Sequence, residues 1–246
     1  MNICQKLNID LVGVPKTQIG KVPKEYEFAT IVGSPMSPDM EILSDLNPDW
    51  VLSPMTLMSD LEPKYKAAGI NYAFINLKSV PEMFKSIKDL GELFNKQKEA
   101  EQLITEFNTF YDNYTKQHKD KKGPKVLVLM GLPGSYVIAT ENSYAGSLVK
   151  LAGATNVYEG TDKEFLNVNT EDMIKKDPDI ILRTAHAMPE EVMEMFDEDF
   201  KNNDIWKHFS AVKNKKVYDL PAEYFGMSAT FDYQKALAFL DEILYQ

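Results

Sequence analysis

Short apolar runs alternate with amphipathic stretches along most of this chain. The apolar runs are bounded by proline and glycine, which is typical of β-strands. They predict strands over 11–15, 29–33, 49–53, 71–77, 125–130, 136–140, 179–183 and 216–220. The stretches between them predict helices over 39–46, 57–68, 144–152, 171–176, 189–196 and 232–245. Alternation of this kind predicts an α/β fold with parallel sheets flanked by helices.

The longest helical pattern lies between these two sets of strands. Ser79 and Glu82 have the spacing of a capping box, and the pattern continues to a glycine–proline stop at 123–124. Gly91 is the one residue inside it that could break the helix. We therefore expect an N-terminal lobe over 1–78, a linking helix over 79–122 and a C-terminal lobe over 123–246.

One segment of each expected lobe repeats the other. Residues 41–52 align without gaps to residues 171–182. Each segment opens on a glutamate, turns at Pro-Asp and continues as an apolar strand, although a helix–turn–strand junction of this type is common. Together with the linking helix, the repeat predicts two similar α/β lobes.

Charge and composition exclude several classes of function. The net charge is −10, whereas a nucleic-acid-binding face is basic. Cys4 is the sole cysteine, so no internal disulfide or thiolate metal cluster can form. The chain has no phosphate-binding loop, nucleophile elbow or zinc-protease motif. These absences favour a binding protein over an enzyme.

Two residues are candidate ligands. His186 follows directly from the strand that ends near Arg183, and ligands of open α/β sheets bind beyond the carboxyl ends of strands. Met36 lies between two prolines in a stiff loop and on no regular core face. From position alone, an ordinary core or loop role is favoured over a ligand role for both residues, since methionine is usually a packing residue.

Four stretches, over 33–41, 126–140, 179–192 and 203–209 followed by 217–220, resemble the helical-backbone substrate-binding proteins that serve ABC importers of siderophores, cobalamin and haem. Within that family they are most similar to the haem-binding lipoproteins of iron-regulated surface determinant systems. The resemblance covers nearly the whole chain. It implies two α/β lobes joined by one long backbone helix, and no enzymatic activity.

The resemblance also implies a ligand and its contacts. Met36 and His186, from opposite lobes, would be the axial ligands of haem iron, while Tyr136 and Arg183 would lie at the haem site. Phe225 and Met227 are further candidates for an apolar pocket wall, from their loop position. A methionine–histidine pair fills both axial positions and leaves none open for oxygen, as a carrier requires.

Partners and location follow from the same resemblance. Glu41 and Glu171 would dock on the permease, although each could equally be a first-turn carboxylate that favours its helix dipole. An upstream surface protein would donate the haem, and the full-length protein would be lipid-anchored at the extracellular face of the membrane. Family members carry an opening strand and most of a helix before the point that corresponds to Met1, so we expect a truncated N-lobe.

Three functions remain open from the sequence. The first is a haem carrier. The second is a carrier of the same fold for a ferric siderophore, cobalamin or a bare metal ion; siderophore sites need cationic side chains, for which only Arg183 and lysines are available. The third is an enzyme that uses His186 as a general base, although no nucleophile or paired carboxylate accompanies it at a known spacing.

Overall fold

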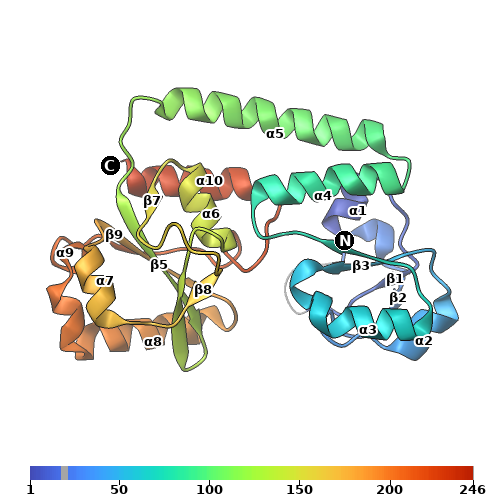
Figure 1. Cartoon of the computed structure of the whole chain (residues 1–246), viewed down its shortest axis with the longest axis horizontal. Helices are drawn as coiled ribbons and strands as arrows, with labels where there is room; N and C mark the ends of the chain where they lie inside the picture. Colours follow the sequence, from blue (N-terminus) through green and yellow to red (C-terminus); the bar gives the residue numbers. More distant parts are fainter. Residues whose placement is uncertain (18–21, 246) are drawn as a thin grey trace. The chain divides into compact units, whose positions relative to one another are not determined.

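A computed structural model describes residues 1–17 and 22–245. The chain forms two compact units (Figure 1). Unit 1 comprises Met1–Asn76 and Pro81–Phe110, and unit 2 comprises Leu77–Val80 and Tyr111–Gln246. The expected mixed α/β class is confirmed.

Unit 1 is built on two small parallel sheets. One pairs β1 with β2 and the other pairs β3 with β4. Its elements before the linking region are α1 (Asn2–Lys6), β1 (Gly13–Val14), η1 (Lys24–Tyr26), β2 (Thr30–Ile31), α2 (Met40–Leu46), β3 (Val51–Pro54), η2 (Met55–Leu57), α3 (Met58–Ala68) and β4 (Tyr72–Ile75). The buried side chains of Val32, Leu43, Leu61 and Tyr65 form a core between the sheets and the helices α2 and α3.

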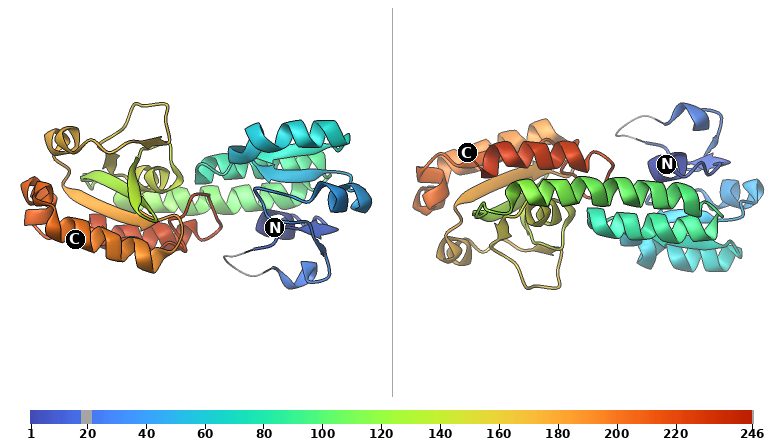
Figure 2. Two further views of the ribbon diagram at one scale, coloured as in Figure 1. Left: turned by 90° about the horizontal axis from the view of Figure 1, so that it is seen from below. Right: turned by 90° about the horizontal axis from the view of Figure 1, so that it is seen from above.

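The expected single linking helix is wrong in one respect, because two helices occupy its range. These are α4 (Val80–Leu93) and α5 (Gln97–His118), and Asn95 adopts a left-handed conformation between them. α4 runs beside the first half of α5, as Figure 2 also shows, and the rings of Phe84 and Phe107 stack at 4.5 Å. A Cβ on Gly91 would lie 2.6 Å from the Cβ of Ala100, so this glycine permits the close approach of the two helices.

α5 is the helix that continues from unit 1 into unit 2. Its 22 residues extend about 33 Å at ~1.5 Å per residue. Residues up to Phe110 belong to unit 1 and those from Tyr111 onward belong to unit 2. The break after α4 therefore leaves a linking helix half as long as the one predicted over 79–122.

Unit 2 contains the larger sheet, with strand order β10–β9–β5–β6–β8 and with β7 paired to the start of β5. β9, β10 and β7 run parallel to their neighbours, whereas β6 and β8 are antiparallel. Its elements are β5 (Lys125–Leu132), β6 (Ser135–Ala139), α6 (Tyr144–Leu151), β7 (Thr155–Asn156), β8 (Phe165–Leu166), α7 (Thr170–Lys176), β9 (Ile180–Ala185), α8 (Pro189–Asn202), η3 (Asp204–His208), α9 (Ser210–Lys213), β10 (Val217–Asp219) and α10 (Tyr233–Leu244).

Helices cover both faces of this sheet. Arg183 of β9 packs against Phe196 of α8 on one face. The next residue, Thr184, points to the other face, where its hydroxyl donates a hydrogen bond to the carbonyl of Phe225 at 2.9 Å. The Phe225 ring in turn contacts Phe239 of α10. Successive strand residues alternate between faces, so β9 is anchored from both sides.

The internal repeat is a repeat in structure as well. α2 and α7 are both seven residues long, and each is capped by the side chain before it, Asp39 or Asn169. Each ends at a residue in the left-handed conformation, Asn47 or Asp177, which reverses the chain before the Pro-Asp turn. The strands β3 and β9 follow. Equal length, equal caps and equal termination explain why the two segments align without gaps.

Candidate functional site

Met36 lies at the tip of a tight loop in unit 1. The loop begins at Gly33, whose φ of 88° is strained for other residues, and Gly33 forms an isolated bridge with Pro38. A Cβ on Gly33 would lie 2.9 Å from both the amide nitrogen of Asp39 and the carbonyl oxygen of Ser37. The loop thus closes on a glycine and presents Met36 with 71% of its surface exposed. An exposed thioether on a stiff loop is suited to contact a ligand.

Two further methionines of unit 1 are exposed after a strand. Met55 and Met58 follow β3 directly, and neither is buried in the core of the unit. Neither was a candidate from the sequence, although the run Pro-Met-Thr-Leu-Met after a predicted strand was a usable signal. Methionine side chains are flexible and polarizable, so they adapt well to a flat apolar ligand.

His186 lies directly beyond the carboxyl end of β9 in unit 2. Its backbone N–H donates to the carbonyl of Gly131 at 3.0 Å, which extends the β5–β9 pairing by one residue, and its side chain is exposed. Met188, two residues further on, adopts the left-handed conformation, with φ 48° and ψ 59°, and is the N-cap residue of α8. A non-glycine residue in that region stores strain, a feature that clusters at functional loops. The His186 loop is therefore fixed at both ends.

Arg183 is buried, with 7% of its surface exposed, and is held by two carboxylates. Its Nε and Nη2 donate to Asp219 at 2.6 and 2.9 Å, and Nη2 also donates to Asp197 at 2.8 Å. Burial acts to lower the pKa of the guanidinium, but the hydrogen bonds and charges of these two carboxylates raise it above its usual value. Arg183 thus fixes β9 to β10 and α8, three residues before His186.

Tyr136 of β6 is half-buried within unit 2. Its hydroxyl donates to Asp199 at 2.8 Å, and the indole N–H of Trp206 donates to the same carboxylate oxygen at 2.7 Å. Burial, and then the Asp199 carboxylate, raise the pKa of the Tyr136 hydroxyl well above its ordinary value. The ring packs against Phe196 at 5.2 Å. Tyr136 therefore acts as a neutral donor in a small polar network at the margin of the core.

Phe225, a candidate for the apolar pocket wall, lies inside the core of unit 2. Phe225 has no exposed surface and packs against Phe239, whereas Met227, two residues on, is half-buried. The carbonyl of Phe225 accepts the hydroxyl of Thr184. Phe225 thus ties the loop before α10 to β9 from inside the core.

Glu41 and Glu171 occupy the same position in the repeated helices. Each is the second residue of its helix, α2 or α7, and each is exposed. The backbone N–H of Glu41 donates to the Asp39 cap. Because both carboxylates are solvent-facing and rest on rigid, capped helices, they are suited to bind a cationic partner while favouring their helix dipoles.

The other two histidines lie away from these loops. His118 is largely buried, although it lies in a highly charged stretch of the sequence. Its side chain is 12% exposed, with Nδ1 2.8 Å from the Tyr114 carbonyl and Nε2 3.2 Å from the Asp241 carboxylate. It joins the end of α5 to α10. His208 is exposed at the end of η3.

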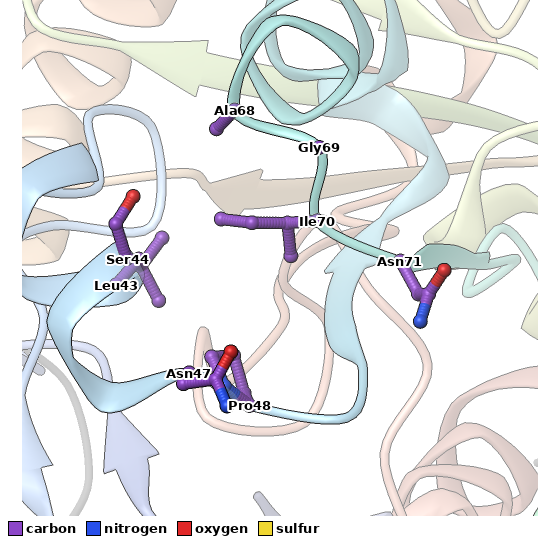
Figure 3. A pocket seen from close by; sticks show the side chains of 8 residues that line it. All are labelled: Leu43, Ser44, Asn47, Pro48, Ala68, Gly69, Ile70 and Asn71. Carbon is purple, nitrogen blue, oxygen red and sulfur yellow. The ribbon is translucent and has the colours of Figure 1, made fainter.

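A hollow of about 190 Å³ in unit 1 lies at the carboxyl ends of α2 and α3 (Figure 3). It is lined by Leu43, Ser44, Asn47, Pro48, Ala68, Gly69, Ile70 and Asn71. Met36 and Glu41 are at the opposite, amino end of α2. Ligand pockets usually enclose at least ~300 Å³, so this hollow is small as well as remote from the candidate ligands.

Residues 1–17 and 22–245 contain no group of three or more His, Cys, Asp and Glu side chains placed to hold a metal ion. Within the same residues, no helix combines the length and the apolar character needed to cross a membrane. Cys4 is buried, and burial raises the pKa of its thiol, as expected for a small packing residue.

Comparisons with known proteins agree with this arrangement. The chain is 43% identical to the high-affinity haem uptake system protein IsdE of Staphylococcus aureus (strain Newman), over 98% of this chain and 82% of that protein. The crystal structure of S. aureus IsdE complexed with haem superposes with a TM-score of 0.90 at 42% identity, covering 99% of this chain and 95% of that one. An ABC transporter substrate-binding protein from Listeria monocytogenes EGD-e gives a TM-score of 0.93 at 46% identity, with 99% and 94% covered.

These relatives are uptake and substrate-binding proteins, which confirms the expectation of a binding protein rather than an enzyme. They also confirm the resemblance to haem-uptake substrate-binding proteins over nearly the whole chain. The family model described as periplasmic binding protein matches residues 8–224. The chain is thus a member of the periplasmic binding protein family.

Proposed function

We propose that this protein binds haem and delivers it to the permease of an ABC importer for iron acquisition. The observation that carries the proposal is the pair of rigid loops, each beyond the carboxyl end of a strand, that expose Met36 in unit 1 and His186 in unit 2. A relative at 43% identity is named for haem uptake. Haem is then cargo rather than a resident cofactor.

Met36 and His186 are the proposed axial ligands of the haem iron. Imidazole is the stronger ligand and the thioether the softer, weaker one. With both axial positions filled by protein, iron is held without a site for oxygen activation. The exposed Met55 and Met58 would add apolar contact to the porphyrin, and Tyr136 would contribute at its edge. Buried Arg183 is better suited to fix β9 than to bind a propionate directly, because its donors already face Asp219 and Asp197.

The siderophore alternative has less support. An anionic ferric chelate needs cationic side chains with hydrogen-bond donors directed at it. Arg183 is the sole arginine of the chain, and two carboxylates neutralise it. The loops around Met36 and His186 carry exposed apolar side chains instead, which suits a largely apolar macrocycle.

Docking and location complete the proposal. Glu41 and Glu171 would contact basic side chains of the permease, since both are exposed at the start of capped helices. The protein would act at the extracellular face of the membrane, lipid-anchored, and would receive haem from a surface donor protein.

The ligand class is tested by titration of the purified protein. Ferric haem should produce a saturable absorbance change with the narrow bands of a six-coordinate iron, whereas ferric siderophores should neither bind nor compete. Lowering the pH should release haem, because protons compete with iron for an imidazole ligand. Saturable siderophore binding without a specific haem spectrum would overturn the proposal.

The docking assignment is tested separately. Replacing Glu41 and Glu171 together by Gln should reduce haem transport in cells, yet leave the haem spectrum in solution unchanged. Glu190→Gln with Glu191→Gln serves as the control, since it removes two exposed carboxylates from the start of α8. Equal transport defects in the two double variants would contradict a specific role for Glu41 and Glu171.

A further inference from the structure

One edge of the unit 2 sheet is rich in lysine, although the chain as a whole is acidic, with a net charge of −10. The amino ends of the parallel strands β5, β9 and β10 lie along this edge. The loops and helix ends that lead into them carry nine lysines and three aspartates. We call this surface the lysine edge, and its lysines are Lys119, Lys121, Lys122, Lys125, Lys175, Lys176, Lys213, Lys215 and Lys216.

Strand pairing brings these segments together. The backbone N–H of Asp179, before β9, donates to the carbonyl of Lys125 at 2.8 Å, and the N–H of Ile181 donates to the carbonyl of Lys216 at 3.0 Å. Adjacent strands are ~4.8 Å apart, so the backbones of Lys125 and Lys216 are separated by about 10 Å across β9. The loop after α5 and the loop before β10 therefore form one continuous basic surface.

The lysines of this edge are not neutralised. All are exposed except the half-buried Lys176. None of them forms a salt bridge with any carboxylate in the described part of the chain. Lys121 instead lies 4.6 Å from the centre of the Tyr245 ring, and Lys176 lies 4.8 Å from that of Tyr158. The carboxylate of Asp179 accepts the backbone N–H of Lys125.

The lysine edge lies far from the His186 loop. The six residues of β9 separate the lysine edge from the His186 loop by about 20 Å at ~3.3 Å per residue. Charges in water are screened over about 8 Å at physiological salt. A surface that approaches this edge therefore senses its nine lysines and three aspartates more strongly than charges around the His186 loop.

We propose that the lysine edge binds the anionic phospholipid headgroups of the membrane. The proposal rests on the proposed location at a membrane surface and is independent of the ligand carried. The His186 loop lies at the opposite edge of the same sheet, because β9 ends there. Membrane contact through the lysine edge therefore turns the His186 loop away from the bilayer.

The test is binding of the protein to vesicles by co-sedimentation. Vesicles with about one third phosphatidylglycerol should bind the protein at low salt, and high salt should release it. Vesicles of phosphatidylcholine alone should not bind it. Each lysine near an anionic surface strengthens binding about fivefold, so Lys213→Gln, Lys215→Gln and Lys216→Gln together should weaken it on the order of 100-fold.

A matched variant separates the patch from net charge. Lys64→Gln, Lys88→Gln and Lys98→Gln together remove the same charge from exposed positions of unit 1, and should weaken vesicle binding less than about threefold. The haem spectrum serves as an independent readout and should be unchanged in both triple variants. Equal weakening in the two triple variants, or no preference for anionic vesicles in the unmodified protein, would overturn the proposal.

Discussion

Units 1 and 2 use the same local segment within sheets of very different size. α2 and α7 match in length, each is capped by the side chain before it, and each ends at a left-handed residue before its strand, β3 or β9. β3, however, pairs with one partner, β4, whereas β9 is enclosed by β5 and β10. Every residue of β9 is buried, but only Ser53 of β3 is. The local segment therefore fixes the geometry of the turn, while the surrounding sheet determines how firmly it is held.

The difference matters for the two candidate ligands. His186 extends a fully buried strand, so its position follows from the unit 2 core. Met36 follows β2, whose two residues are exposed, and its position depends on the closed loop from Gly33 to Pro38. We expect substitutions in the core to dominate the stability of unit 2 and substitutions in loops and caps to have the larger share in unit 1.

The largest expected effect is in the unit 2 core. Trp206 is fully buried, stacks on Phe200 at 3.8 Å and donates to Asp199. Trp206→Ala should lower the free energy of unfolding of this unit by about 3–5 kcal/mol. Leu61→Ala, in the smaller core of unit 1, should cost about 2–3 kcal/mol. Urea unfolding followed by circular dichroism measures both, and a larger loss for Leu61→Ala would reverse the comparison.

Substitutions at two glycines measure the contribution of the Met36 loop separately. Gly33 and Gly160 both have positive φ, but a Cβ on Gly33 meets backbone atoms while nothing lies within 4 Å of one on Gly160. Gly33→Ala should cost about 2–3 kcal/mol of strain and alter the haem spectrum, whereas Gly160→Ala should cost about 1 kcal/mol. Thermal unfolding and the haem spectrum are the measurements. Equal costs would show that the Met36 loop is not closed as described.

The helix caps test the repeat itself. Asp39 accepts the backbone N–H groups of both Glu41 and Ile42, whereas Asn169 accepts that of Asp172. Asp39→Ala should therefore cost about 1–2 kcal/mol and Asn169→Ala about 1 kcal/mol or less. Denaturant midpoints of the two variants compare them directly. If neither variant changes its midpoint, the caps are not what fixes the two helices.

The smallest expected effect is a dependence of stability on pH. In unit 2, the backbone N–H of Gly160, and then Lys150, lower the pKa of Glu141 from its usual 4.5. A carboxyl whose pKa is lowered by folding stabilises the fold above its unfolded pKa, and that contribution disappears as the pH falls through the folded value. Glu141→Gln should therefore reduce the loss of stability on acidification below about pH 4.5. Glu62→Gln in unit 1 should change this loss of stability less, because the Glu62 carboxylate is more exposed than that of Glu141.

The sequence predicted the order of elements and the repeat because both depend on local signals. Apolar runs, caps and the Pro-Asp turns are each encoded within a few residues. The sequence offered Gly91 as the break, but α4 continues to Leu93 and the chain turns at Asn95. The antiparallel pair that results packs through Phe84 and Phe107, which is a tertiary contact. The hydrophobic pattern alone predicted one continuous helix, because α4 and α5 each have an apolar face.

Side-chain environments were harder to predict for the same reason. Arg183 meets Asp219 across 36 positions of sequence, so its neutralisation could not be read from its neighbours. His118 lies in a run of lysines, yet Asp241 of α10 covers it. Phe225 lies in a segment whose pattern predicts a loop, yet α10 buries its side chain. In contrast, the positions of Met36 and His186 after strands were predictable, since strand ends are set by local sequence.

The central claim is that Met36 and His186 are the two axial ligands of haem iron. It is tested most directly by the absorption and electron paramagnetic resonance spectra of haem-loaded Met36→Ala, His186→Ala and, as a control, Met188→Ala. His186→Ala should lose haem most readily, Met36→Ala should retain haem with a changed spectrum, and Met188→Ala should match the unmodified protein. Native spectra in both Met36→Ala and His186→Ala would contradict the assignment.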